Sequence, residues 1–284
     1  MSLALQYPLL AEIYAFILGA IFGSFLNVCI ARWPRERSIV RPRSRCPRCA
    51  NQLAWFENIP LASWLVLRGR CRCCDEPISV MYPLIELVVA IGWTIAVHVY
   101  GPTLLALRVA VFGTVLLGVA MTDAQHYLIP DGFTLFGLFF AVFTSVLAFF
   151  HGQTQVFAGP YDALIGACTG AGMIAIVGWL GEVVTKREAM GLGDVTLMAF
   201  VGAALGPARA LVTVFVGATI GAVAFVAFVM PMTMMRRGGR EQTELALGGT
   251  PFEAPLVPFG VFLAPAALLT LFWGDALLLW LQRP

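Results

Sequence analysis

Eight long stretches of apolar residues, separated by short polar segments, make up most of the chain. They cover residues 9–31, 83–100, 103–121, 133–150, 161–181, 194–206, 209–231 and 257–281. Most approach the roughly 20 apolar residues that a helix needs to cross a bilayer. Strong period-2 alternation, the pattern of membrane barrels, is absent. The pattern therefore predicts an all-α polytopic membrane protein with about eight transmembrane helices, of which 194–206 is the shortest.

The composition agrees with this prediction. Hydrophobic residues make up 60% of the 284 positions and charged residues only 12%, about half the charge of a typical soluble domain. The formal net charge is +2, and nucleic-acid binding would call for a larger basic surface with aromatic residues. We therefore expect the lipid bilayer, and no nucleic acid, as a partner of the chain.

One long polar segment, residues 32–82, interrupts the pattern after the first apolar stretch. It contains ten Arg, four acidic residues and five of the seven Cys. About fifty residues cannot build a large core, and modules of this size usually need a metal or disulfides. The expected organisation is a first transmembrane helix (1–31), a small metal-binding module (32–82) and a transmembrane core (83–284).

The distribution of basic residues predicts the orientation in the membrane. The first basic residue, Arg32, follows the first apolar stretch, so we expect no cleavable signal peptide and an N-terminus outside. Eight spans then place loops 32–82, 182–193 and 232–256 inside, with fifteen Lys or Arg, and leave Arg108, Arg209 and Arg283 outside. This positive-inside bias predicts that both termini are outside and that the module is cytoplasmic.

Four cysteines of the module have the spacing of a metal site. Cys46 and Cys49 form one C-x-x-C pair, and Cys71 and Cys74 form a second one after 21 intervening residues. Four thiolates suit zinc in a closed, structural site, and the cytoplasm disfavours disulfides. Cys71 and Cys74 are the better second pair because a C-x-x-C turn places both sulfurs on one side, although Cys73 remains an alternative ligand. The alternative interpretation is that these cysteines are reduced thiols that bind no metal.

Two aspartates lie where apolar stretches meet short loops. Asp123 ends the third span and Asp194, in a G-x-G-D turn, begins the sixth, so the predicted topology places both on the cytoplasmic side. Two close carboxylates can share a proton and activate water for attack on an amide. Asp194 and Asp131 could instead be helix N-caps, whereas Asp123 at a helix C-terminus would oppose the helix dipole. On physical grounds alone, a transporter that uses the two aspartates for proton coupling is an equally good interpretation.

Several motifs in a fixed order resemble the prepilin peptidases, the bifunctional leader peptidases of type IV pili and type II secretion. The motifs are GSFLNVCIARWP at 23–34, the double C-x-x-C, WFENIPLASWLVLRGRC at 55–71, ISVMYPLIE at 78–86, DAQHYLIPD at 123–131, GLGD at 191–194 and VPFGVFLA at 257–264. The resemblance implies an intramembrane aspartyl protease of the bacterial inner membrane, with Asp123 and Asp194 as its catalytic residues. It implies cleavage of a short basic leader from type IV pilin or pseudopilin precursors on the cytoplasmic side.

Many members of the family also methylate the freed N-terminal amine with S-adenosylmethionine. By resemblance, Asn58, Pro60 and Glu86 are candidates for methylation or leader binding. Glu86 could equally be an acid at the membrane interface, and Asn58 and Pro60 could form a turn inside the zinc module. A third overall interpretation makes the module a binding platform and the membrane part its anchor, but eight spans exceed what an anchor needs.

Overall fold

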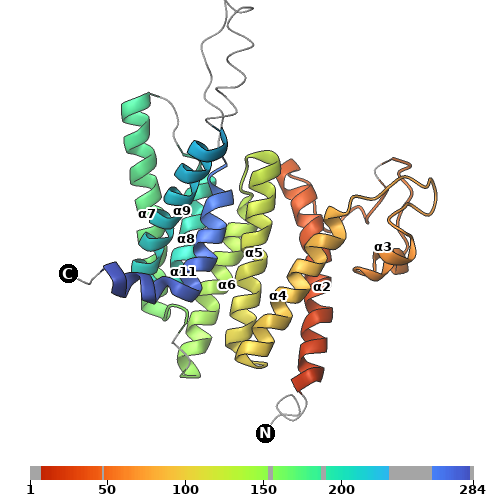
Figure 1. Ribbon diagram of the computed structural model, residues 1–284, viewed down its shortest axis with the longest axis horizontal. Helices are drawn as coiled ribbons and strands as arrows, with labels where there is room; N and C mark the ends of the chain where they lie inside the picture. Colours follow the sequence, from red (N-terminus) through yellow and green to blue (C-terminus); the bar gives the residue numbers. More distant parts are fainter. Residues whose placement is uncertain (1–7, 47, 153–155, 187–189, 230–257, 282–284) are drawn as a thin grey trace, which may run out of the picture.

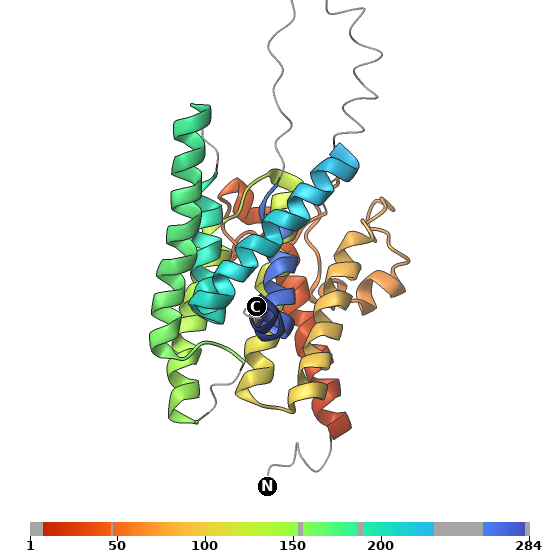
Figure 2. The same ribbon diagram turned by 60° about the vertical axis from the view of Figure 1, so that its left-hand side comes forward.

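The computed structural model describes residues 8–46, 48–152, 156–186, 190–229 and 258–281 of the chain. Within these residues the apolar stretches are helices that pack side by side (Figures 1 and 2). The helices are α2 (Pro8–Arg32), α4 (Met81–Tyr100), α5 (Leu104–His126), α6 (Asp131–Phe150), α7 (Pro160–Thr185), α8 (Leu192–Leu205), α9 (Pro207–Ala224), its short π-helical extension η3 (Phe225–Val229) and α11 (Gly260–Leu281).

Seven of these helices have the length and apolar composition to cross a membrane, so the chain is a multi-pass, all-helical membrane protein, as predicted. The exception is α8, which has 14 residues and is only about 21 Å long, shorter than the roughly 30 Å of a bilayer core. Nearly all of its residues from Leu197 to Leu205 are buried. Helix α8 packs against α6, α7 and α9, so its apolar composition serves burial within the protein.

Helices α7 and α8 approach each other more closely than any side chain would permit. A Cβ atom placed on Gly202 of α8 would lie 2.0 Å from the carbonyl oxygen of Gly166 on α7, and one on Gly170 would lie 2.1 Å from the carbonyl oxygen of Met198. Small residues at such contacts let helix backbones touch, which supplies packing energy in lipid. These glycines therefore fix where α8 lies along α7.

Helix α5 connects the two sides of the bundle. It packs against α4 and α2 on one side and against α6 and α11 on the other. Helices α2 and α4 also pack closely on each other, with Gly19 of α2 against the backbone of Ala90 on α4. The core between α5 and α8 contains Phe112 and Phe200, whose ring centroids lie 5.2 Å apart.

Two of the three arginines assigned to the outside take part in the packing of one end of the bundle. Arg108 of α5 is 4% exposed, donates a hydrogen bond to the carbonyl of Ala158 at 3.4 Å and lies over the ring of Phe157. Arg209 of α9 donates to the carbonyl of Val156 at 2.6 Å and forms a bidentate ion pair with Asp275 of α11. Both arginines thus hold the segment before α7 in place.

Between α2 and α4 the chain forms a module with little regular structure. Its helical pieces are η1 (Trp33–Arg35), η2 (Trp55–Asn58) and α3 (Ala62–Val66). Trp64 of α3 packs inward, where its Nε1 donates to the carbonyl of Ile78 at 3.2 Å and its ring lies against Gly69. In Figures 1 and 2 the module lies beside the α2 and α4 end of the bundle.

Candidate active site and metal centre

Asp123 lies in the last turn of α5 and is 5% exposed. Helix α5 ends three residues later, where Tyr127 adopts a left-handed conformation and donates its N–H to the carbonyl of Asp123. A carboxylate at this position opposes the dipole of its own helix. A second helix offsets this unfavourable interaction with the dipole of α5. The N–H of Val261, in the first turn of α11, donates a hydrogen bond to Asp123 Oδ2 at 3.0 Å.

Asp194 lies in the first turn of α8, which begins at Leu192 with Gly191 in the cap position. The backbone N–H of Gly191 faces the carboxylate, so Asp194 also supports the start of its helix, as an acid at this position commonly does. Its second oxygen, Oδ1, is buried without a hydrogen-bond partner, the one such side-chain atom among the described residues. A buried acceptor without a partner is costly and is typical of an oxygen that meets water or a substrate.

The two carboxylates come from helices that are about 70 residues apart in the chain and lie close enough for their charges to interact. Ile129, in the loop that follows α5, lies between the two helix starts. A Cβ on Gly193 would lie 2.9 Å from Ile129 Cβ, and one on Gly260 would lie 2.8 Å from Ile129 Cδ1. Glycine at both positions therefore allows α8 and α11 to approach Ile129, and with it Asp123.

The nearby Asp131 is not the N-cap that the sequence suggests. Helix α6 begins at Asp131 itself, Pro130 occupies the cap position, and no side chain caps the helix. Asp131 is exposed, so it retains only the favourable interaction of an acid with a helix N-terminus.

The cysteines of the module lie in two turns of the same geometry. In each turn the N–H of the first cysteine donates to a carbonyl five residues later, at 3.0 Å for Cys46 and 2.9 Å for Cys71. The residue after the second cysteine is left-handed in both, with φ of 55° at Ala50 and 53° at Asp75. The chain therefore repeats one local conformation, and each copy presents a pair of sulfurs.

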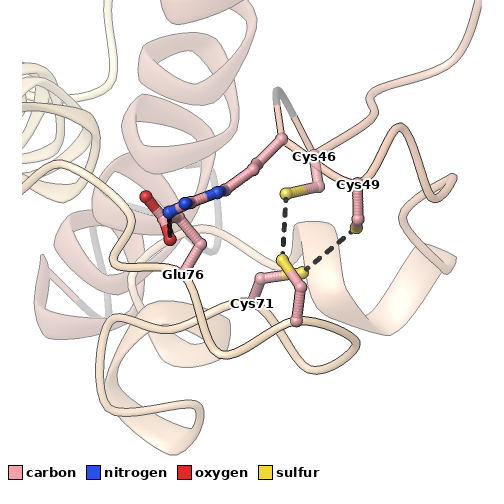
Figure 3. Close-up of polar contacts among 6 residues, drawn as sticks. Cys46, Cys49, Cys71 and Glu76 are labelled. Atoms are coloured by element: carbon pink, nitrogen blue, oxygen red, sulfur yellow. Dashed lines mark hydrogen bonds and ion pairs between the residues drawn. The ribbon is translucent and has the colours of Figure 1, made fainter.

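The four sulfurs of Cys46, Cys49, Cys71 and Cys74 lie within 4.8 Å of one another, close enough for all four to hold one metal ion. Cys46 Sγ is 3.8 Å from Cys74 Sγ, and Cys49 Sγ is 3.9 Å from Cys71 Sγ. Figure 3 shows the side chains of Cys46, Cys49 and Cys71 turned toward one another. Cys73 is exposed and lies outside the cluster, because the repeated turn directs Cys74, the third residue after Cys71, toward the other sulfurs.

Local electrostatics favour a thiolate in this cluster. Backbone N–H groups of Cys49 and then Arg48 face the sulfur of Cys46 and lower the pKa of its thiol to about 6. Deprotonated sulfur is the form that binds metals. Arg48 of the first turn also forms an ion pair with Glu76 of the second turn (Figure 3). This ion pair joins the two turns in addition to the contacts between their sulfur atoms.

Glu86 is buried inside the second turn of α4, and its partner is in the module. Its Oε2 accepts a hydrogen bond from the backbone N–H of Leu61 at 2.8 Å. Pro60 is therefore brought next to Glu86, whereas Asn58 is exposed at the end of η2. Asn27 of α2 makes a similar contact by donating to the carbonyl of Tyr82 at 3.0 Å.

Sequence reasoning missed the contribution of α11. The signal in the sequence is the motif VPFGVFLA at 257–264, which includes the start of α11 but gives no role to Val261. The contact of Val261 with Asp123 joins residues 138 positions apart, and no local pattern predicts such a pairing.

A pair of carboxylates at one end of a helical membrane bundle, in a chain that also carries a four-cysteine cluster, defines a membrane protein equipped for acid–base chemistry. Two family models match the chain: the Bacterial Peptidase A24 N-terminal domain over residues 17–100 and the Type IV leader peptidase family over residues 110–226. The first range includes the cysteine cluster, and the second includes both Asp123 and Asp194.

Curated proteins agree with the family models. A prepilin leader peptidase/N-methyltransferase of Myxococcus xanthus is 42% identical over 83% of this chain and 67% of its own length. The proteins of the same name from Stutzerimonas stutzeri and Pseudomonas aeruginosa are 34% and 33% identical, over 94% and 95% of this chain and 92% and 93% of their own lengths. No solved structure is a significant match.

The chain therefore belongs to the type IV leader peptidase family and is an aspartic peptidase of the A24 type. This membership agrees with the resemblance drawn from the sequence motifs, and it gives no support to the transporter alternative.

Proposed function

We propose that this protein cleaves the leader peptide from type IV prepilin-like precursors, with Asp123 and Asp194 as its catalytic pair. The observation that carries the proposal is the convergence of the two carboxylates from α5 and α8, with Asp194 Oδ1 buried and without a hydrogen-bond partner in the part of the chain that the structure describes. The names of the relatives agree, since one from Escherichia coli, 35% identical over 71% of this chain and 80% of its own length, is a type 4 prepilin-like proteins leader peptide-processing enzyme.

In this mechanism the pair carries one proton. A water molecule attacks the carbonyl carbon of the scissile amide and gives a proton to the ionised carboxylate, while the protonated carboxyl donates its proton to the carbonyl oxygen. When the tetrahedral intermediate collapses, a proton passes to the leaving amine and the pair returns to its starting state. The pair acts as one titrating unit, and the N–H of Val261 supports negative charge on Asp123.

The proposed orientation places this chemistry at the cytoplasmic surface. Burial of Arg108 and the ion pair of Arg209 with Asp275 explain why two basic residues lie at the opposite end of the bundle. Helix α8 is short, but it still carries the chain from Asp194 to the other end of the bundle, where Gly206 meets Ala158 and Asp162 at the start of α7. With α8 counted as a crossing and the two arginines engaged in packing, the charge bias favours periplasmic termini and a cytoplasmic module. A substrate with an apolar helix and a basic leader would then present its scissile bond near the inner interface, where water is available.

We assign zinc to the four-cysteine cluster. Four thiolates at mutual distances below 4.8 Å match a closed tetrahedral site, which leaves no position open for substrate. Cys46, Cys49, Cys71 and Cys74 would hold the ion, and its contribution is to stabilise the fold of the module.

The second proposed activity is methylation of the new N-terminus with S-adenosylmethionine, as the names of the relatives suggest. The amine exists only after hydrolysis, so cleavage comes first. Asn58, Pro60 and Glu86 remain the candidates for this step. The hydrogen bond from Leu61 to Glu86 supports a positioning role for Glu86, which would hold the turn at Pro60 against α4.

The test of the catalytic pair compares Asp123→Asn and Asp194→Asn with Asp131→Asn. Purified protein is incubated with a pilin precursor, and the product masses are measured. We expect each of the first two variants to lose cleavage by at least about 100-fold, the usual contribution of a general acid or base. Asp131→Asn should cleave normally, because an exposed acid at a helix start contributes at most about 1 kcal/mol to stability. Substantial cleavage by either of the first two variants, at normal abundance, would exclude the pair.

A further inference from the structure

The module exposes apolar side chains along one continuous segment, residues 55–66. Trp55 is 73% exposed, Leu65 68% and Val66 80%, and Phe56 and Ile59 are also exposed. All five lie on η2, on α3 or in the turn between them, and η2 and α3 pack on each other. We call this surface the apolar face of the module. A protein surrounded by water rarely exposes such a face unless something covers it.

The position of Glu86 shows how far along the membrane helices this face extends. Glu86 is the sixth residue of α4, roughly 8 Å along the helix axis from its start. It also lies beside Gly23 of α2, where a Cβ would be 2.7 Å from Glu86 Cα. Gly23 is nine residues before the end of α2, a distance of about 14 Å. Both distances place Glu86 well inside the ends of α2 and α4.

The hydrogen bond from Leu61 to Glu86 places the turn before α3 at the same depth. Figures 1 and 2 agree, because α3 lies beside the bundle rather than beyond the ends of its helices. Backbone at this depth needs a partner for each N–H, since lipid supplies none. The carboxylate of Glu86 is that partner for Leu61, and the carbonyl of Ile59 accepts from both the N–H and the hydroxyl of Ser63.

Basic residues follow the apolar face directly. Arg68, Arg70 and Arg72 are all exposed. Arg72 lies over the ring of Phe56 and 3.9 Å from Glu57, so positive charge lies at the border of the apolar face. Apolar side chains next to arginines are typical of protein surfaces that lie in the interface of an anionic membrane.

We infer that the apolar face of the module inserts into the headgroup and acyl boundary of an anionic leaflet, with Arg68, Arg70 and Arg72 at the phosphates. The occupant of this surface is the bilayer itself. The module is therefore a membrane-embedded element joined to α4 through Glu86, and its cysteine cluster is held at the membrane surface. The inference does not depend on the proposed catalytic pair or on which side of the membrane the module faces.

The experiment uses a photo-crosslinking amino acid, p-benzoyl-phenylalanine, at Val66 in one variant and at Val40 in another. The two positions are a matched pair: both are valines of the module, and they are 80% and 76% exposed. Val40 lies in the segment that Arg32, at the end of α2, holds through the carbonyls of Ser38 and Pro42, outside the apolar face. A third variant with the crosslinker at Leu65 repeats the test on the neighbouring residue.

Each full-length variant is reconstituted in nanodiscs of phosphatidylethanolamine and phosphatidylglycerol, irradiated, and analysed by mass spectrometry for lipid adducts. We expect at least about fivefold more phospholipid adduct at Val66 and Leu65 than at Val40, because only an inserted face meets acyl chains continuously. Nanodiscs of phosphatidylcholine alone should reduce this yield, since the arginines then lack anionic partners.

Equal adduct yields at Val66 and Val40, or no lipid adduct at Val66 and Leu65, would overturn the inference. A pilin precursor added in excess tests the rival occupant. If the crosslinks at Val66 pass from lipid to the precursor, the face is a substrate surface and the inference is wrong; unchanged lipid adducts support it.

Discussion

Replacing Gly202 with alanine tests whether backbone contact between α7 and α8 positions Asp194. The added methyl group would lie 2.0 Å from the carbonyl oxygen of Gly166, whereas ordinary van der Waals contact begins at 3.4 Å. The helices must therefore separate by about 1.4 Å, because the obstacle is backbone and no side chain can rotate away. Asp194 lies eight residues before Gly202 on the same helix, about 12 Å away, so the displacement carries over to its carboxylate.

We expect Gly202→Ala to lower the rate of leader cleavage by about 100-fold, the usual effect of a 1 Å misplacement in an active site. Overpacking should also lower the free energy of unfolding by about 1–3 kcal/mol. The assay is single-turnover cleavage of a pilin precursor by purified protein, at a temperature well below the midpoint of thermal unfolding. Under these conditions a loss of rate reports the position of Asp194 and not the amount of folded protein.

Gly172→Ala is the matched control. Gly172 also lies on α7, but a Cβ there would meet no atom within 4 Å. We expect its cleavage rate to be unchanged and its stability to rise by at most about 1 kcal/mol, because alanine is the better helix former. Equal rates for Gly202→Ala and Gly172→Ala would refute the idea that this contact positions Asp194.

Two further predictions concern the module. Metal analysis of purified protein should find zinc, with less of it in Cys46→Ser and an unchanged amount in Cys73→Ser; a folded and active preparation without metal would contradict a structural site. Glu86→Leu leaves the N–H of Leu61 without its partner, a loss of about 1–3 kcal/mol, and should lower methylation of a cleaved pilin more than cleavage of the precursor. Glu86→Gln keeps an acceptor oxygen and should retain most of both activities. The masses of the cleaved and methylated products measure both effects.

The sequence by itself predicted much of the fold, because membrane spans and C-x-x-C turns depend on local patterns. The length of each apolar stretch predicts a membrane helix without knowledge of its neighbours. The spacing of Cys46, Cys49, Cys71 and Cys74 likewise reflects a short turn that the chain forms twice. The order of motifs was enough to indicate the family, and comparison with known proteins agrees.

The same local patterns could not distinguish a residue buried inside the protein from one that faces lipid or lies at the surface. Helix α8 is as apolar as a membrane span, yet it is short and lies inside the bundle, because apolar residues satisfy a protein interior and a lipid bilayer equally well. From the sequence, Arg108 counts as a basic residue on the outside, near the start of the apolar stretch 103–121, but in the structure it is buried against Phe157. Charge counting treats all arginines alike, although one with a protein partner carries less information about topology.

Tertiary structure supplied the geometry of the candidate active site. The sequence predicted Asp123 and Asp194 as a pair on one side of the membrane, but it did not show which contacts bring them together. Their approach requires the glycine contact between α7 and α8, the packing of Ile129 against the starts of α8 and α11, and the N–H of Val261 at Asp123. Each of these contacts joins segments far apart in the chain, so only packing of the whole bundle could bring the two carboxylates together.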